Sequence, residues 1–289
     1  MRRINYDSPT AIKAFLAEHG FAMQKKFGQN FLINPSARIN LVKQLRIEED
    51  DEVWEVGAGL GAMTSLLLER GAQVSAFELD RGFCAVLKEM FADEKKFTLI
   101  EGDVLDTWKL SAQKELHPCG RSLLGNLPYT IGAKLLGDFA EHHFFFTRMV
   151  VTVQREVARR IAAQAGDKDY SSLSVLLSRS YNTKLLSPLK GESFFPVPHV
   201  ESQGVLLELK DSAQRTKDSA CFAPLVRALF SSRRKTVRNN LQAFLKARNI
   251  SCAAIDILED CGIDGGERAE RLTPDEFARI AHHLSCTLC

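Results

Sequence analysis

Short apolar runs alternate with segments of helical periodicity between about residues 53 and 163, and this alternation restricts the fold more than any other feature of the chain. The predicted strands are 53–56, 74–77, 97–100, 123–124 and 149–153. The predicted helices between them are 63–68, 83–90, 134–139 and 157–163. Because strands that alternate with helices form parallel sheets covered on both faces, we predict an α/β fold with a mostly parallel sheet.

The rest of the chain follows a different pattern. Two strand-like runs, 185–189 and 204–209, flank a Pro-containing loop and are expected to close the sheet with antiparallel pairing. The polar stretch 211–220 is expected to be a linker, and 221–284 shows helical spacing without strand-like runs. Since 289 residues suffice for two domains, we expect a sheet domain over 1–210 and a small all-helical domain over 211–289.

Composition excludes several classes of protein. With 45% hydrophobic and 26% charged residues, the chain is neither disordered nor fibrous. Its 7 cysteines are scattered and odd in number, which does not suggest a disulfide framework. The first 20 residues carry Asp7 and Glu18 and lack the apolar core of a signal peptide, and no uncharged apolar stretch reaches the length of about 18 residues that a membrane span needs. We expect a cytoplasmic protein without a membrane segment.

A glycine-rich turn follows the first predicted strand, in the sequence EVGAGLGA (55–62). Gly57 and Gly59 allow a ligand close to the backbone, and the helix that begins there presents free N–H groups. Glu78 ends the second strand, where a carboxylate accepts hydrogen bonds from a ribose diol. The pattern predicts a site for an adenosine-containing cofactor, and it leaves a nicotinamide dehydrogenase open because Gly57, Gly59 and Ala62 also satisfy GxGxxA.

Residues that follow the third and fourth predicted strands indicate which ligand groups the site can bind. Asp103 is suited to accept a hydrogen bond from the amino group of a cofactor adenine. The side chain of Asn126 and the backbone carbonyl of Leu127 or Pro128 can both accept from an exocyclic amine, and Tyr129 offers a face on which a base can stack. This arrangement would hold an amino nitrogen against an electrophilic methyl group.

Several motifs together resemble one family. They are KKFGQNFL (25–32), EVGAGLG (55–61), FELD (77–80), EGDVLD (101–106), NLPY (126–129), FFPVPHVES (194–202) and FSSRRKTVRNNL (230–241). In order and spacing they resemble the KsgA-type dimethyladenosine transferases of small-subunit ribosomal RNA. The resemblance implies a Rossmann-like class I methyltransferase fold and S-adenosylmethionine as cofactor.

The resemblance also implies roles for individual residues. Asn30 and Leu32 would contact the cofactor, and Gly57 would lie against its methionine part. Asn126 would lie where cofactor and target amine meet, while Tyr129 and Phe194 would sandwich a flipped adenine. Glu78 and Asp103 keep the ribose and adenine roles already predicted from their chemistry. The implied reaction is dimethylation of N6 on two adjacent adenosines near the 3′ end of the RNA, within an immature 30S-type subunit, by a protein expected to be a monomer.

The chain carries 38 basic and 36 acidic residues, so any surface for RNA must be a local patch. Basic residues without an acidic neighbour in sequence lie between 227 and 248, where Arg234 and Arg238 are predicted to share a helix face. The predicted RNA-binding residues are Lys25, Lys26, Arg227, Arg233, Arg234, Lys235 and Arg238.

Other functions remain open at this point. One is a large-subunit RNA dimethyltransferase of the macrolide-resistance type, and another is a non-catalytic RNA-binding assembly factor. The dehydrogenase is disfavoured because no catalytic His, Lys or Tyr-x-x-x-Lys signature accompanies the glycine turn. No metal site is predicted, although His282, His283, Cys286 and Cys289 have a spacing that zinc can use.

Overall fold

The computed structural model describes residues 4–21, 29–113, 121–211 and 219–288, and the chain forms two compact units. The first comprises Met1–Leu135, Phe144–Ala158 and Thr183–Leu209. The second comprises Leu136–His143, Arg159–Asn182 and Lys210–Cys289. The helical unit therefore draws on more of the chain than the predicted 211–289, and the RNA-binding role expected for that segment stays a prediction.

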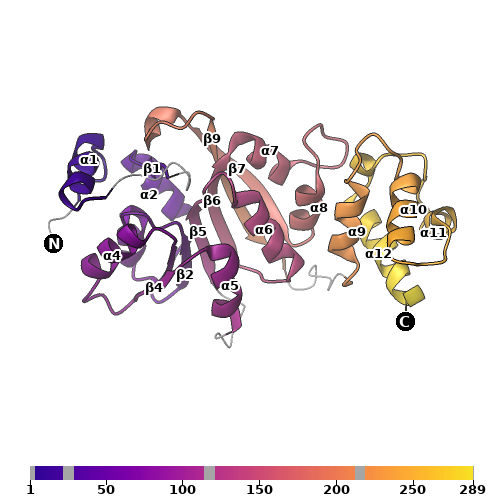
Figure 1. Cartoon of the computed structure of the whole chain (residues 1–289), viewed down its shortest axis with the longest axis horizontal. Coiled ribbons are helices and arrows are strands. Elements are labelled where there is room, and N and C mark those ends of the chain that lie inside the picture. The colour runs from indigo at the N-terminus through magenta and orange to yellow at the C-terminus, as the bar shows by residue number, and fades with distance from the viewer. Residues whose placement is uncertain (1–3, 22–28, 114–120, 212–218, 289) are drawn as a thin grey trace. The chain divides into compact units, whose positions relative to one another are not determined.

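Seven of the described strands form one sheet. In chain order they are β2 (Glu52–Val56), β3 (Gln73–Glu78), β4 (Phe97–Glu101), β5 (Ser122–Asn126), β6 (Arg148–Gln154), β7 (Tyr181–Leu189) and β9 (Ser202–Leu209). Their order across the sheet is β4-β3-β2-β5-β6-β9-β7 (Figure 1). Strands β2 to β6 pair in parallel, and β9 runs antiparallel to β6. The predicted mostly parallel sheet with antiparallel closure is confirmed.

Helices connect these strands. Those predicted from periodicity are α3 (Ala62–Leu68), α4 (Arg81–Met90), α6 (Gly132–Glu141) and α7 (Arg155–Ala162). Those not predicted are α1 (Pro9–Glu18), α2 (Pro35–Gln44), α5 (Val104–Gln113) and α8 (Ser172–Ser178). Ser8 and Asn34 cap α1 and α2 by accepting hydrogen bonds from backbone N–H groups, and a proline follows each cap. Ser-Pro and Asn-Pro are therefore the helix-start signals that mark these two helices in the sequence.

Residues of β2 alternate between two buried faces of the sheet. Val53 belongs to a core cluster that includes Leu41 of α2. Trp54 points to the opposite face, where its ring packs against Phe77 and Phe144 at centroid separations of 4.7 and 5.2 Å. Because both faces are covered, the strand has apolar residues on each side, which is the pattern of a parallel sheet.

The order of strands reverses between β2 and β5, and this point positions the site. β3 and β4 lie on one side of β2, whereas β5 and β6 lie on the other. Val56, the last residue of β2, pairs with Gly125 of β5 and with Phe77 of β3. In open α/β sheets, ligands bind in the crevice outside the carboxyl ends of the strands at such a switch point.

Two short strands form a separate antiparallel ladder, β1 (Phe31–Leu32) and β8 (Phe194–Phe195), in which Phe31 pairs with Phe195 and Leu32 with Phe194. A single-turn 3₁₀ helix, Gly191–Ser193, leads into β8. The ladder joins the QNFL and FFPVP motifs, which are far apart in the sequence.

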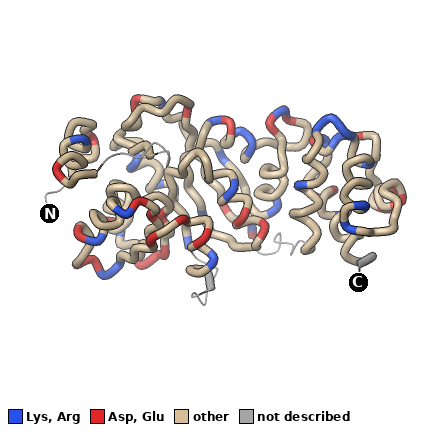
Figure 2. The backbone as a smooth tube through the Cα atoms, in the orientation of Figure 1, with Lys and Arg blue, Asp and Glu red and all other residues tan. Residues whose placement is uncertain are grey.

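The second unit is helical. Its helices include α8 (Ser172–Ser178), α9 (Phe222–Leu229), α10 (Val237–Ala247), α11 (Ala254–Asp260) and α12 (Pro274–Leu288), with a 3₁₀ turn at Ala269–Arg271. Buried apolar residues such as Leu225, Leu241 and Phe277 form its core. Lys and Arg gather in the turn between α9 and α10 (Figure 2). The predicted helical C-terminal region is confirmed over residues 219–288.

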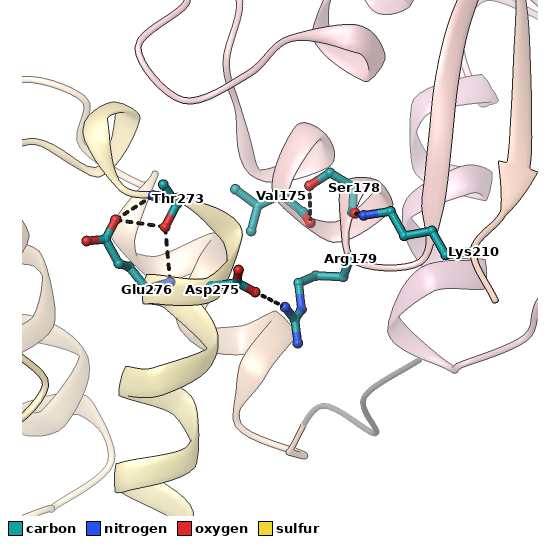
Figure 3. A network of polar contacts seen from close by, with 7 residues as sticks. All are labelled: Val175, Ser178, Arg179, Lys210, Thr273, Asp275 and Glu276. Carbon is teal, nitrogen blue, oxygen red and sulfur yellow. Dashed lines mark hydrogen bonds and ion pairs between the residues drawn. The ribbon is translucent and has the colours of Figure 1, made fainter. Parts of the chain in front are cut away.

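Polar contacts fix the start of α12 within this unit (Figure 3). The Thr273 hydroxyl accepts from the Glu276 backbone N–H (3.3 Å), and the Glu276 carboxylate accepts from the Thr273 backbone N–H (2.8 Å), which is a capping box. Arg179 forms an ion pair with Asp275 (2.5 Å) and so joins the end of α8 to α12. Within the described ranges, no helix combines the length and apolar character needed to span a bilayer.

One buried carboxyl group on β2 makes stability depend on pH. Glu55 is fully buried; the Thr64 hydroxyl donates to its Oε2 (2.6 Å), whereas Oε1 has no hydrogen-bond partner among the described residues. Burial raises the pKa of Glu55 from 4.5 to about 7, against the opposing effect of Thr64. A raised pKa means that the folded state holds a proton that the unfolded chain releases, so this stabilising contribution is lost as pH rises from 4.5 to above 7.

We therefore predict that Glu55→Gln reduces the fall in unfolding free energy between pH 5 and pH 8 by roughly 3 kcal/mol. Urea unfolding followed by tryptophan fluorescence measures this in the first unit alone, because Trp54 and Trp108 both belong to it. Glu89→Gln, at an exposed position of α4, is the matched control and should leave the pH dependence as it is. An identical pH dependence in Glu55→Gln and the wild type would contradict the raised pKa of Glu55.

Candidate active site

An open cavity of about 790 Å³ lies at the carboxyl ends of β2 to β5 in the first unit. The residues predicted for the site that line it are Asn30, Gly57, Gly59, Glu78, Asp103, Asn126, Leu127, Pro128 and Tyr129. Gln29, Phe31, Leu79, Phe83, Val104 and Ile131 also line it, and the sequence reasoning did not single them out.

The glycine turn and Glu78 form one wall of this cavity. Gly57 and Gly59 have φ values of +76° and +57°, which side chains other than glycine rarely adopt. The Gly59 N–H donates to Oε2 of Glu78 (2.8 Å), and the N–H groups of Leu79 and Asp80 donate to Oε1 (2.9 and 2.8 Å). Burial raises the pKa of Glu78, while these three hydrogen bonds oppose that shift. The carboxylate is therefore held in one orientation at the end of β3.

Asp103 provides a second carboxylate on the cavity. Its Oδ1 accepts from the Leu105 N–H (2.9 Å) at the start of α5, which fixes the side chain. Apolar side chains of Leu79, Val104 and Ile131 line the same cavity. Two acidic acceptors and an apolar lining suit the ribose hydroxyls, the amino group and the ring of an adenosine. The residues present therefore fit the adenosyl part of S-adenosylmethionine.

The corner that follows β5 is fixed by hydrogen bonds to other segments. The side-chain Nδ2 of Asn126 donates to the backbone carbonyl of Asn30 (2.7 Å), and the Leu127 N–H donates to the carbonyl of Thr152 on β6 (3.0 Å). Because Nδ2 is engaged in this way, the amide presents Oδ1 as an acceptor. The carbonyl of Pro128 already accepts from the N–H groups of Ile131 and Gly132 (3.0 and 3.1 Å).

Tyr129 completes this corner. It is half-buried, it lines the cavity, and its hydroxyl lies 2.5 Å from the hydroxyl of Ser202. Burial raises the pKa of the Tyr129 phenol, so the hydroxyl keeps its proton at neutral pH. Ser202 ends the FFPVPHVES motif, but its contact with Tyr129 was not predicted.

Two predicted residues do not line the cavity. Leu32 and Phe194 are paired across the β1–β8 ladder, and they are 5% and 1% exposed in the core cluster of the sheet. Side chains alternate along a strand, so Phe31 lines the cavity, whereas Leu32 is buried and lines a second pocket that shares Asn30, Gly57, Gly59 and Asn126 with the first. The cofactor contact expected of Leu32 stays a prediction. Phe194 is therefore not among the residues that line the cavity, and its expected place opposite Tyr129 on a target adenine stays a prediction.

The basic residues of the second unit differ from the prediction in two ways. Arg227 forms an ion pair with Glu141, and Arg233 pairs with Glu270 (3.0 Å), so acidic partners distant in sequence accompany the patch. Arg234 lies in the turn before α10, which begins at Val237, and therefore shares no helix face with Arg238.

The remaining basic residues present their charge to solvent. Arg234, Lys235 and Arg238 are exposed and form no ion pair within the described part of the chain, in the region where Figure 2 shows basic residues together. Lys25 and Lys26 lie outside the described residues.

Cysteine and histidine residues add no second site to the described chain. Burial raises the pKa of the Cys84 thiol to about 12, so it stays protonated at neutral pH. Over the described ranges, no group of three or more His, Cys, Asp or Glu residues is arranged to hold a metal ion. The side chain of Cys286 and all of Cys289 lie outside what the structure describes.

Comparison with known proteins gives a consistent result. The family model for ribosomal RNA adenine dimethylase matches residues 20–285. A protein of Treponema denticola named ribosomal RNA small subunit methyltransferase A is 44% identical over 279 residues, covering 96% of this chain and 94% of that protein.

Two solved structures share the fold. The dimethyladenosine transferase of Plasmodium falciparum matches with a TM-score of 0.72 and 24% identity, over 88% of this chain and 97% of that chain. The 23S rRNA methyltransferase ErmE matches with a TM-score of 0.59 and 20% identity, over 88% of this chain and 99% of that chain. The chain belongs to the ribosomal RNA adenine dimethylase family.

Proposed function

We propose that this protein transfers methyl groups from S-adenosylmethionine to N6 of two adjacent adenosines near the 3′ end of small-subunit ribosomal RNA, two methyl groups to each. The observation that carries the proposal is the orientation of Asn126. Its Nδ2 is held by the Asn30 carbonyl, at the edge of a cavity whose other residues suit an adenosine. The amide oxygen is thereby available to a target amine.

In this reaction the protein mainly aligns the target amine with the methyl group. The sulfonium of the cofactor supplies an electrophilic methyl group. Adenine N6 is a weak nucleophile because its lone pair is delocalised into the ring. In the first transfer, Oδ1 of Asn126 and a backbone carbonyl accept its two hydrogens, and in the second transfer one of these acceptors holds the hydrogen that remains. This favours a more tetrahedral nitrogen and stabilises the positive charge that develops. Leu127 is the better source of that carbonyl, since the Pro128 carbonyl already accepts two N–H groups.

The target base must leave its stack to reach the cavity. Extrusion costs a few kcal/mol in a duplex and less in a loop. The ring of Tyr129 offsets this cost by stacking on the base. With Phe194 in the core, no second aromatic partner is assigned. The described residues that line the cavity include no His or Lys, so we assign no general base, and the proton that N6 loses in each transfer leaves to water.

The alternative functions have less support than the proposed one. The fold does not decide which ribosomal subunit is the substrate, because it is shared with the 23S rRNA methyltransferase ErmE. The name of the Treponema denticola relative favours the small subunit. A non-catalytic assembly factor would not need the Asn126 amide held at a cavity whose lining suits an adenosine, which favours an enzyme.

The partners follow from the same proposal. The substrate is small-subunit RNA, in an immature 30S-type subunit, and exposed Arg234, Lys235 and Arg238 would contact its phosphates. A monomeric state and a cytoplasmic location are further predictions from the sequence.

The proposal predicts that the purified protein dimethylates adenines in small ribosomal subunits that lack this modification, as read by mass spectrometry of digested RNA. Asn126→Ala should reduce transfer by about a hundredfold or more, because an acceptor to the reacting amine is lost, while S-adenosylhomocysteine still binds. Asn40→Ala, at an exposed position of α2, is the matched control. Absence of dimethyladenosine with the wild type, or full activity in Asn126→Ala, would refute the proposal.

A second prediction concerns the basic turn. The double variant Arg234→Ala/Lys235→Ala should weaken binding to the subunit and reduce the slope of log affinity against log salt by about one for each lost phosphate contact. Arg227→Ala should change the slope less, because the Arg227 guanidinium is paired with Glu141. Filter binding across a salt series measures both slopes. A wild-type slope in the double variant would exclude the turn from RNA contact.

A further inference from the structure

A hydrogen bond between the side chains of Tyr129 and Ser202 connects the corner after β5 to strand β9, which does not line the cavity. The two hydroxyl oxygens are 2.5 Å apart, and either group can donate. Ser202 is the first residue of β9 and is 0% exposed, whereas Tyr129 is half-buried. A hydroxyl buried so completely loses its bonds to water, so its protein partner matters for stability and position.

The position of Ser202 is itself fixed by the sheet. Ser202 pairs with Gln154 at the end of β6, and the backbone N–H of Arg155 donates to the carbonyl of Glu201 (2.9 Å). Strand β6 also holds the other side of the corner, because its Thr152 carbonyl accepts from the Leu127 N–H (3.0 Å). The corner is therefore attached at Leu127 and at the Tyr129 hydroxyl to one antiparallel strand pair.

A tyrosine side chain turns about two single bonds, and its hydroxyl oxygen lies on the axis of the second. A hydrogen bond to that oxygen therefore limits the first rotation, which sets where the ring lies, and restrains the second through the preference of the phenol O–H for the ring plane. We propose that Ser202 is a positioning residue, which fixes the Tyr129 ring so that its face lies against the target base during methyl transfer. The inference rests on the proposed function. It assigns the Tyr129 hydroxyl a tethering role and no part in proton transfer.

A double-mutant cycle tests this role. Ser202→Ala and Tyr129→Phe each remove one end of the tether, and each should lower kcat for methylation of small ribosomal subunits about five-fold to ten-fold, the effect typical of one hydrogen bond. If each hydroxyl affects kcat only through its hydrogen bond to the other, the double variant should be no slower than the single variants. The affinity for S-adenosylhomocysteine should stay at the wild-type value in all three.

The pH dependence of kcat separates a tether from an acid or base. Tyr129→Phe should keep the shape of the wild-type profile, since only the height changes when a tether is lost. Ser178→Ala is the matched control in the second unit: it removes a hydroxyl that donates to the Val175 carbonyl (3.1 Å; Figure 3), and kcat should not change.

Three results would overturn the inference: losses in the two single variants that multiply in the double variant, an unchanged kcat in Tyr129→Phe, or a new shape of its pH profile. Tyr129→Phe remains informative if Ser202→Ala does not fold. A wild-type protein that leaves the subunits unmethylated would refute the proposed function itself. Methylation by the wild type, with losses in kcat that multiply in the double variant, would refute only the role of Ser202.

Discussion

The hydrogen bond from the Asn126 side chain to the Asn30 carbonyl joins parts of the chain that are 96 residues apart, and the chemistry of the site depends on it. An amide side chain can present either its oxygen or its nitrogen to a ligand. Because the nitrogen is engaged, the oxygen is the group available to an amine. The bond therefore decides which kind of substrate atom the corner can hold.

The parallel sheet makes this arrangement possible. Parallel strands bring all their carboxyl ends to one edge, and the reversal of strand order between β2 and β5 leaves a crevice there. Glu78, Asp103 and Asn126 follow or end different strands and meet at the same cavity. The antiparallel strand β9 adds Ser202 on the far side of β6 and so reaches Tyr129 from outside the crevice.

The sequence predicts the sheet and most of the cavity well, because buried parallel strands are continuous apolar runs and their ends follow directly. It predicts less where an element is too short to show a pattern, or where a contact joins residues far apart in the sequence. A two-residue strand such as β1 has no period to read, so Phe31, which lines the cavity, was not singled out. The ion pair between Arg227 and Glu141 depends on tertiary structure alone. Thr236 caps α10 and leaves Arg234 outside the helix.

The most direct test is a crystal structure of the protein with S-adenosylhomocysteine. The ribose hydroxyls should lie on Glu78 and the adenine amino group on Asp103. The thioether should point toward the Asn126 corner, and Nδ2 of Asn126 should still donate to the Asn30 carbonyl. A thioether directed away from that corner, or an Asn126 amide turned so that its nitrogen faces the ligand, would contradict this account.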